Sequence, residues 1–94
     1  MRDPDDGGDM KHTGEDRYRP GMLAYSLQWR DKGRVYVIIR RDKQFALAAD
    51  GKKHPISAPK RKNIKHLQLI NRFVDIAQAD DTVIIQAIED YSGR

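Results

Sequence analysis

One segment of the chain is suited only to the interior of a sheet. Residues Arg34 to Arg40 read Arg-Val-Tyr-Val-Ile-Ile-Arg, so five β-branched or aromatic side chains stand between two arginines. Such residues favour extended backbone, and the side chains of a strand alternate between its two faces. Both faces of this segment are therefore apolar, which predicts a central strand that is covered on both sides.

Shorter segments around it alternate apolar and polar residues between polar turns, as strands of an antiparallel sheet do. One expected strand is 22–27, with Leu23, Tyr25 and Leu27 on one face. Another is 44–49, with inward side chains Phe45, Leu47 and Ala49. A last short strand is expected over 64–69.

The Asp50-Gly51 pair is a hairpin signal, because both residues tolerate the backbone conformations of a tight turn. We therefore expect 52–56 to pair back as a strand, with Pro55 confining it to an edge because proline lacks a backbone N–H. The next segment, Pro59-Lys60-Arg61-Lys62-Asn63, predicts a basic loop.

The pattern changes towards the end of the chain. Apolar residues recur at helical spacing at Val83, Ile84, Ala87, Ile88 and Tyr91, which predicts a helix over 82–91. Asp80 or Asp81 is available as its N-cap, and Gly93 as its stop. Residues 71–79 fit either a short helix or a connection.

Several short strands followed by one helix predict a mainly β fold, a small antiparallel barrel with a C-terminal helix. With 94 residues there is room for one such domain, which we assign to 21–94. Residues 1–20 are rich in Gly, Pro and charge and predict a disordered acidic tail. No Cys is present, so disulfides and thiol chemistry are excluded. No apolar run is long enough to span a membrane, and a cytoplasmic protein is expected.

The net charge of +4 is unevenly distributed. Residues 21–79 contain thirteen basic and four acidic residues, a net charge of +9, whereas the segments before and after them are net acidic. A basic body between acidic ends is typical of a module that binds a polyanion. A solvated Lys/Arg surface is the plainer interpretation.

No constellation for catalysis or metal binding is evident. His12, His54 and His66 do not have metal-ligand spacing, and a metal site needs three or four convergent ligands. The carboxylates gather in the acidic ends, where cap and surface roles are simpler than acid–base work. We therefore expect no enzymatic activity, no small-molecule substrate, no metal and no cofactor.

Two stretches carry a resemblance to a known family. Gly21-Met22-Leu23-Ala24-Tyr25-Ser26, followed by Arg30-Asp31-Lys32-Gly33-Arg34 and the Val/Ile strand, resembles the KOW motif of ribosomal and transcription-associated proteins. Ala49-Asp50-Gly51-Lys52 and Lys65-His66-Leu67-Gln68 extend the resemblance to small bacterial KOW-domain RNA-binding proteins. These are similar to a KOW-bearing family of archaeal and eukaryotic large-subunit ribosomal proteins. The chain departs from the pattern at Trp29, where Gly is usual, and at Leu27, where Lys is frequent.

The resemblance covers about residues 21–69 and implies an SH3-like barrel that binds RNA without catalysis. It implies ribosomal RNA or a ribosome-associated structured RNA as the partner, with the ribosome or its proteins as neighbours in the cytoplasm. The matched turn would place Arg30, Lys32, Gly33 and Arg34 at the RNA. Further basic residues would extend this face: Lys52, Lys53, Lys60, Arg61, Lys62 and Lys65.

Individual residues of this turn have two interpretations. Trp29 is the single Trp, and its ring either folds over the end of the barrel or stacks on an unpaired base. Asp31 is expected to act within the turn, bonded to nearby backbone N–H groups or to Arg30 or Lys32. Tyr36 is expected to belong to the wall or the core of the barrel.

A second class of function stays open. SH3-like barrels also bind proteins, so a protein-interaction adaptor could use the barrel groove or the helix near 82–91. RNA binding requires a contiguous basic face, whereas an adaptor requires an exposed aromatic or apolar groove. The acidic tail has its own alternatives: it masks the basic face, or it is an inert linker.

Overall fold

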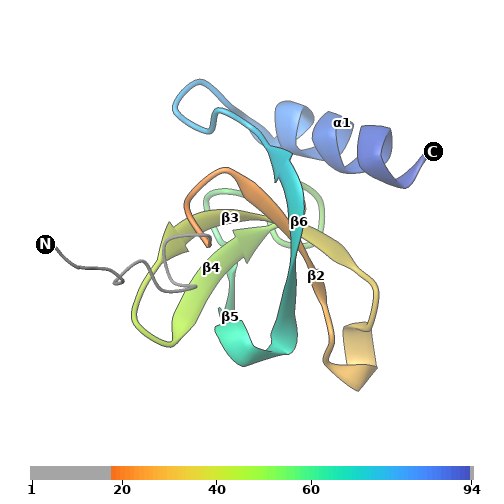
Figure 1. Ribbon diagram of the computed structural model, residues 1–94. Coiled ribbons are helices and arrows are strands. Elements are labelled where there is room, and N and C mark those ends of the chain that lie inside the picture. The colour runs from red at the N-terminus through yellow and green to blue at the C-terminus, as the bar shows by residue number, and fades with distance from the viewer. Residues whose placement is uncertain (1–17, 94) are drawn as a thin grey trace, which may run out of the picture.

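A computed structural model of the chain describes residues 18–93, which form five strands, two short 3₁₀ helices and one α-helix (Figure 1). The strands are β2 (Met22–Ser26), β3 (Val35–Arg41), β4 (Phe45–Ala49), β5 (Lys60–Asn63) and β6 (Leu67–Phe73). The 3₁₀ helices are η2 (Trp29–Asp31) and η3 (Ile64–His66), and the α-helix is α1 (Asp81–Ser92). The predicted mainly β fold with a C-terminal helix is confirmed.

All neighbouring strands are antiparallel and follow the order β5-β4-β3-β2-β6. The outermost strands, β5 and β6, are joined through η3, which is consistent with an SH3-like arrangement. Within residues 18–93, however, β5 pairs only with β4 and β6 only with β2, so the sheet is not closed into a complete barrel.

The central strand of this sheet is β3, as its composition predicts. Val37 belongs to a buried cluster with Leu23, Ile70 and Ile84, whereas Ile38 belongs to a second cluster with other strand residues. The second cluster also contains Ala24, Ala46 and Leu67. Two clusters on one strand explain why both of its faces must be apolar.

The inward face of β4 differs from the prediction. Ala46 and Ala48 are buried and Phe45 and Leu47 are only partly buried, whereas Ala49 is fully buried as predicted. The register pairs Ala46 with Lys62 and Ala48 with Lys60. The small alanine side chains leave room for the long lysine stems of the neighbouring strand, which a larger inward pair would not.

The two segments after Gly51 have the opposite secondary structure to the prediction: the expected strand is a turn, and the expected loop is a strand. Residues 52–56 were expected to form a strand and instead form a turn, because the Asp50 carboxylate accepts the backbone N–H groups of Lys52 and His54 at 2.9 and 2.8 Å. The expectation of a basic loop over 59–63 is also wrong. Lys60–Asn63 is the edge strand β5, paired with β4 after Pro59 has ended the turn.

The α-helix covers the cluster that contains Val37, and its Ile84 is fully buried there. The predicted N-cap is confirmed, since the Asp80 carboxylate accepts the backbone N–H of Val83 at 3.0 Å. Asp81 accepts the backbone N–H of Ile56 at 2.8 Å, which fixes the start of the helix to the turn before β5. Segment 71–79, for which the sequence fits either a short helix or a connection, forms the end of β6 and a short connection.

The expected disordered tail, 1–20, lies mostly outside the described residues, which begin at Tyr18. Tyr18 itself packs against the cluster that contains Ile38. The folded part therefore begins at least three residues before Gly21. No helix within 18–93 is both long and apolar enough to cross a bilayer.

Candidate functional site

The connection between β2 and β3 is held by a buried lysine from β5. Lys62 Nζ lies 3.1 Å from Asp31 Oδ2, 2.8 Å from Gln28 Oε1 and 3.1 Å from Ser26 Oγ. Asp31 also accepts the hydroxyl protons of Ser26 at 2.6 Å and of Tyr36 at 2.7 Å. We call these five residues the Lys62 network.

The Lys62 network fixes the protonation of its acidic members. Burial alone would raise the pKa of Asp31, but hydrogen bonds from Ser26, Tyr36 and Lys62 outweigh burial and hold that pKa well below its usual range. Burial and the hydrogen bond to Asp31 raise the pKa of Tyr36 above its ordinary value. Asp31 is therefore a carboxylate and Tyr36 a neutral phenol. The expected partners of Asp31, Arg30 or Lys32, are wrong.

A polar pocket of about 550 Å³ opens beside this network. Four basic side chains line it: Arg30 from η2, Arg34 just before β3, Lys53 from the turn after β4 and Lys60 from β5. Gln28, Asp31, Tyr36 and His54 complete the lining. We call it the cationic pocket. Side chains from four separate segments thus face a single concavity.

Arg34 stands beside an acidic side chain. Its Nη1 lies 3.6 Å from Oδ2 of Asp50, which is nearly buried while the arginine is half exposed. Burial would raise the pKa of Asp50, but the backbone N–H groups of His54 and Lys52, together with the His54 and Arg34 side chains, hold it below its usual value. The Asp50 carboxylate therefore orders both the turn and the arginine.

The remaining predicted basic residues are distributed over several surfaces. Lys62 is buried, so it lies beneath the expected RNA face rather than on it. Arg61 points to the other side of β5, where its guanidinium stacks 3.7 Å from the centroid of the Phe45 ring. Lys52 Nζ lies 4.0 Å from Oε2 of Glu89 on α1. Lys32, Gly33 and Lys65 are exposed but do not line the cationic pocket.

Trp29 is 82% exposed on η2. The interpretation in which its ring folds over the barrel end is therefore wrong. Leu27, two residues earlier, is also exposed. The tip between β2 and β3 thus presents an aromatic ring beside Arg30, which lines the cationic pocket.

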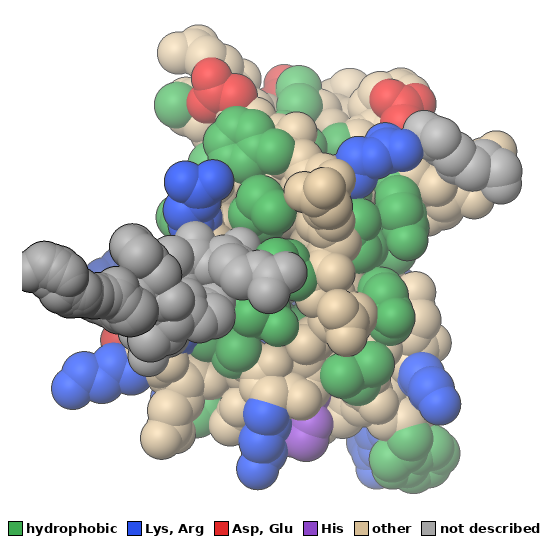
Figure 2. Space-filling view, viewed as in Figure 1, with side chains coloured by type: hydrophobic (Ala, Val, Ile, Leu, Met, Phe, Trp, Pro, Cys, Tyr) green, Lys and Arg blue, Asp and Glu red, His purple; other side chains and the backbone are tan. Residues whose placement is uncertain are grey.

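Charge is also partitioned over the surface as a whole. Figure 2 shows most of the visible acidic side chains at the end that carries α1 and the loop before it, and most of the visible Lys and Arg side chains nearer the opposite end. Along the described part of the chain, no group of three or more His, Asp or Glu side chains is placed to hold a metal ion.

Sequence reasoning did not anticipate Ser26 and Gln28 as parts of the site. Ser26 is the last residue of the stretch 21–26 and Gln28 lies in the loop after it, and both reach the Lys62 network through strand register or turn geometry. No protein-family model matches the chain, and no curated protein matches it.

Proposed function

We propose that this protein is a non-enzymatic RNA-binding module, and that its partner is ribosomal RNA or a ribosome-associated structured RNA in the cytoplasm. The observation that carries the proposal is the convergence of Arg30, Arg34, Lys53 and Lys60 on one pocket. Like charges repel, so four cations around one concavity are favoured when a polyanion neutralises them. The resemblance to the KOW motif points to the same partner.

The chemistry of the pocket suits phosphate. An arginine guanidinium forks onto two phosphate oxygens, whereas lysine supplies a mobile point charge. Two carboxylates accompany these cations. Asp31 lines the pocket but is bonded to Ser26, Tyr36 and Lys62, so its charge is largely compensated within the protein. Asp50 lies 3.6 Å from Arg34 and accepts the backbone N–H groups of Lys52 and His54, so its charge is compensated as well.

Trp29 adds a second mode of contact. An exposed indole gives a base a flat surface to stack on, which contributes about 1–3 kcal/mol for each stacked base. Because Trp29 adjoins Arg30, one RNA strand can reach both the ring and the pocket. Four phosphate contacts would give a slope of about −3 to −4 for log K against log salt concentration.

The test removes pocket charge and compares it with an equal loss elsewhere. The variant Arg30→Gln, Lys53→Gln, Lys60→Gln loses three charges from the cationic pocket. The control Arg19→Gln, Arg40→Gln, Lys43→Gln loses three exposed charges near the far end of β3. Affinity for ribosomal RNA fragments is measured by filter binding at several salt concentrations.

We expect the pocket variant to lose at least tenfold in affinity and to reduce the salt slope by about 2–3, with a clearly smaller effect of the control. Equal losses in the two variants would mean that only overall charge matters. If crosslinking in cells recovers proteins and no RNA, the adaptor function replaces this proposal.

A further inference from the structure

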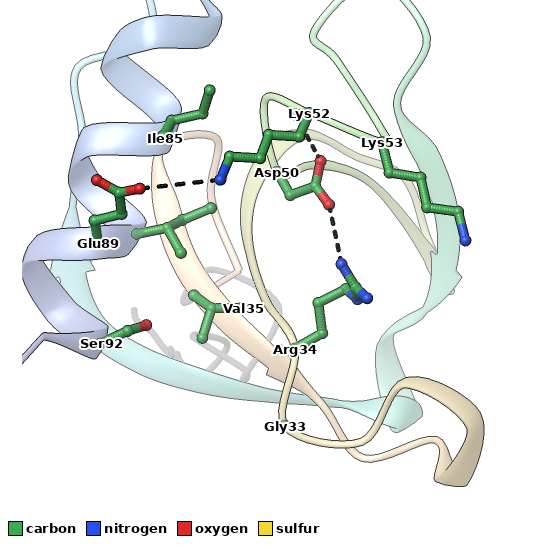
Figure 3. Close-up of a pocket in the computed structure, with 10 residues that line it drawn as sticks. Gly33, Arg34, Val35, Asp50, Lys52, Lys53, Ile85, Glu89 and Ser92 are labelled. Carbon is green, nitrogen blue, oxygen red and sulfur yellow. Dashed lines mark hydrogen bonds and ion pairs between the residues drawn. The ribbon is translucent and has the colours of Figure 1, made fainter.

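A second pocket lies between α1 and the start of β3 (Figure 3). It has a volume of about 340 Å³. Its apolar lining comes from Val35, Ile85 and Ile88, and its polar lining includes Glu89 and Ser92 of the helix. We call it the helix pocket. It combines an apolar wall with polar groups at its margin.

The helix pocket adjoins the cationic pocket, because Arg34 and Lys53 line both. Figure 3 shows Lys53 directed away from α1 and Arg34 on the opposite side of Asp50 from Glu89. These two cations therefore separate the apolar wall from the charged concavity. A ligand whose anionic part occupies the cationic pocket can extend an apolar part towards the helix.

We infer that the helix pocket receives an unpaired nucleobase of the bound RNA, and this inference rests on the proposed RNA-binding function. A nucleobase has flat apolar faces and a polar edge, and a phosphodiester lies on either side of its sugar. Val35, Ile85 and Ile88 would contact the faces. Glu89 would accept from an exocyclic amine. A base in a continuous duplex is stacked on both sides and is not free to enter, so the preferred RNA has a loop or a bulge.

The entrance to the pocket is held only weakly. Lys52 on the turn and Glu89 on the helix meet at 4.0 Å, and Figure 3 shows this pair joining the two walls. Both side chains are exposed, and exposed ion pairs of this kind contribute little to stability. An entering base can therefore separate the pair at small cost and use both side chains for its polar edge.

Charge selects a nucleotide over an apolar peptide segment as the occupant. The apolar wall does not stand alone: Arg34 and Lys53 border it directly, and Arg30 and Lys60 lie beyond them. Arg34 is already paired with Asp50 at 3.6 Å, but an apolar peptide would bring no counter-charge to Arg30, Lys53 and Lys60. A polynucleotide provides the apolar group and the repeated anion together.

The test compares two RNA hairpins of one sequence, one fully paired and one with a single bulged 2-aminopurine. Two variants alter the helix pocket: Ile85→Gln removes an apolar wall residue that lies outside the main core cluster, and Ser92→Trp fills the pocket from an exposed position. Val83→Gln is the control, because Val83 is an exposed apolar residue on the same helix and does not line the pocket.

We expect the wild-type protein and Val83→Gln to bind the bulged RNA about tenfold more tightly than the paired RNA, and to shield the 2-aminopurine from acrylamide. Both pocket variants should reduce this preference to about twofold while binding paired RNA as before. Because Trp29 could also recognise an unpaired base, the pocket variants decide the question. An unchanged preference in both variants overturns the inference.

The failure of the inference differs from the failure of the proposed function. If the wild-type protein binds both RNAs equally and still depends on the cationic pocket, only the helix-pocket inference is overturned. If the protein binds neither RNA, the proposed function fails as well. If an acidic peptide with an apolar residue displaces the bulged RNA and binds more tightly, a protein partner replaces the base as the occupant.

Discussion

Lys62 Nζ on β5 lies 3.1 Å from Asp31 Oδ2 at the end of η2, although the two residues are 31 positions apart in the sequence. The lysine side chain is 1% exposed and the aspartate side chain 18%. This contact joins an edge strand to the loop between β2 and β3. It therefore sets how Arg30 on that loop faces Lys60 on the strand, and thus the shape of the cationic pocket.

Replacing Lys62 by methionine should destabilise the fold. The substitution keeps much of the side-chain volume but leaves the Asp31 carboxylate without its cation in a largely desolvated place. Removing one partner of such a pair costs about 3 kcal/mol, which in a domain of this size lowers the melting temperature by more than about 10 °C. Thermal unfolding followed by circular dichroism measures the effect.

Two further variants separate loss of the pair from loss of charge. Lys65→Met removes an exposed cation three residues away and should change the melting temperature by only a few degrees. The double variant Lys62→Met, Asp31→Asn should be more stable than the sum of the single variants predicts, because it no longer contains an unpaired charge. Strict additivity would show that the two side chains do not interact.

The carboxylates of Asp31 and Asp50 should make the fold sensitive to acid. The pKa values of Asp31 and Asp50 are both lowered in the folded state, so the unfolded chain binds more protons as the pH falls. Their contribution to stability is complete above the unfolded pKa of about 3.9. It declines as the pH decreases from there through the folded values.

Urea unfolding at a series of pH values between about 7 and 2.5 measures this decline. Asp31→Asn should be less stable than wild type at neutral pH but should lose less stability on acidification, because one of the two responsible groups is gone. Asp42→Asn, at the exposed turn between β3 and β4, is the matched control. A wild-type free energy of unfolding that stays constant below pH 4 would contradict the argument.

The sequence identifies the elements whose local pattern is strong. The β-branched run of β3 and the helical spacing of α1 are each visible without knowledge of partners. The burial of Lys62 could not be predicted in this way, because a run of basic residues has the pattern of a solvated loop. The burial of Lys62 depends on the pairing of β5 with β4, which places Lys62 opposite Ala46, and on the ion pair with Asp31 from a distant loop. Neither contact is between neighbours in the sequence, so the local sequence pattern does not predict the burial of Lys62.

The four cations that line the cationic pocket all belong to the predicted basic set, and the other members of that set lie on other surfaces or, as Lys62, in the interior. Alternation along β5 places Arg61 on the opposite face from Lys60 and Lys62, and of these two lysines only Lys62 is buried. A loop has no such alternation, so the wrong secondary structure at 60–63 made the three residues seem equivalent. A correct strand assignment would have separated Arg61 from the two lysines, whereas the burial of Lys62 depends on Asp31.

Gly51 and Gly33 provide a matched pair for testing how closely α1 approaches the sheet. Both have positive φ, +82° for Gly51 and +86° for Gly33, a backbone conformation that residues other than glycine rarely adopt. A Cβ at Gly51 would lie 2.7 Å from the Asp81 carbonyl oxygen and 2.7 Å from Ile85 Cγ1, whereas a Cβ at Gly33 meets no atom within 4 Å. Gly33→Ala should cost about 1–2 kcal/mol from backbone strain alone. Gly51→Ala should cost clearly more, and chemical denaturation compares the two.

The outcome for the helix gives a second readout. In Gly51→Ala the helix must shift away from the turn, so amide hydrogen exchange should accelerate in α1 more than in β3. Equal destabilisation by the two substitutions would mean that α1 does not rest on the turn at Gly51.

Neighbouring residues on β5 should differ in their effect on RNA binding. Lys60 lines the cationic pocket, while Arg61 stacks on Phe45 on the other side of the strand. Each substitution, Lys60→Gln or Arg61→Gln, removes one charge from the same stretch of chain. We expect Lys60→Gln to weaken RNA binding about three- to tenfold and to reduce the salt slope by about 1, with little change in Arg61→Gln. The reverse order would place the RNA on the Phe45 side of β5.

Trp29 should report directly on RNA binding, because it is the single Trp of the chain and its side chain is 82% exposed. In the free protein its fluorescence should be that of a solvated indole and should be quenched readily by acrylamide. Stacking on a base should quench the emission at saturating RNA and protect the ring from acrylamide. Trp29→Phe should bind somewhat more weakly and Trp29→Ala about tenfold more weakly, because the flat ring contributes about 1–3 kcal/mol. If saturating RNA leaves both emission and acrylamide access unchanged, the RNA is bound through the cations without the indole.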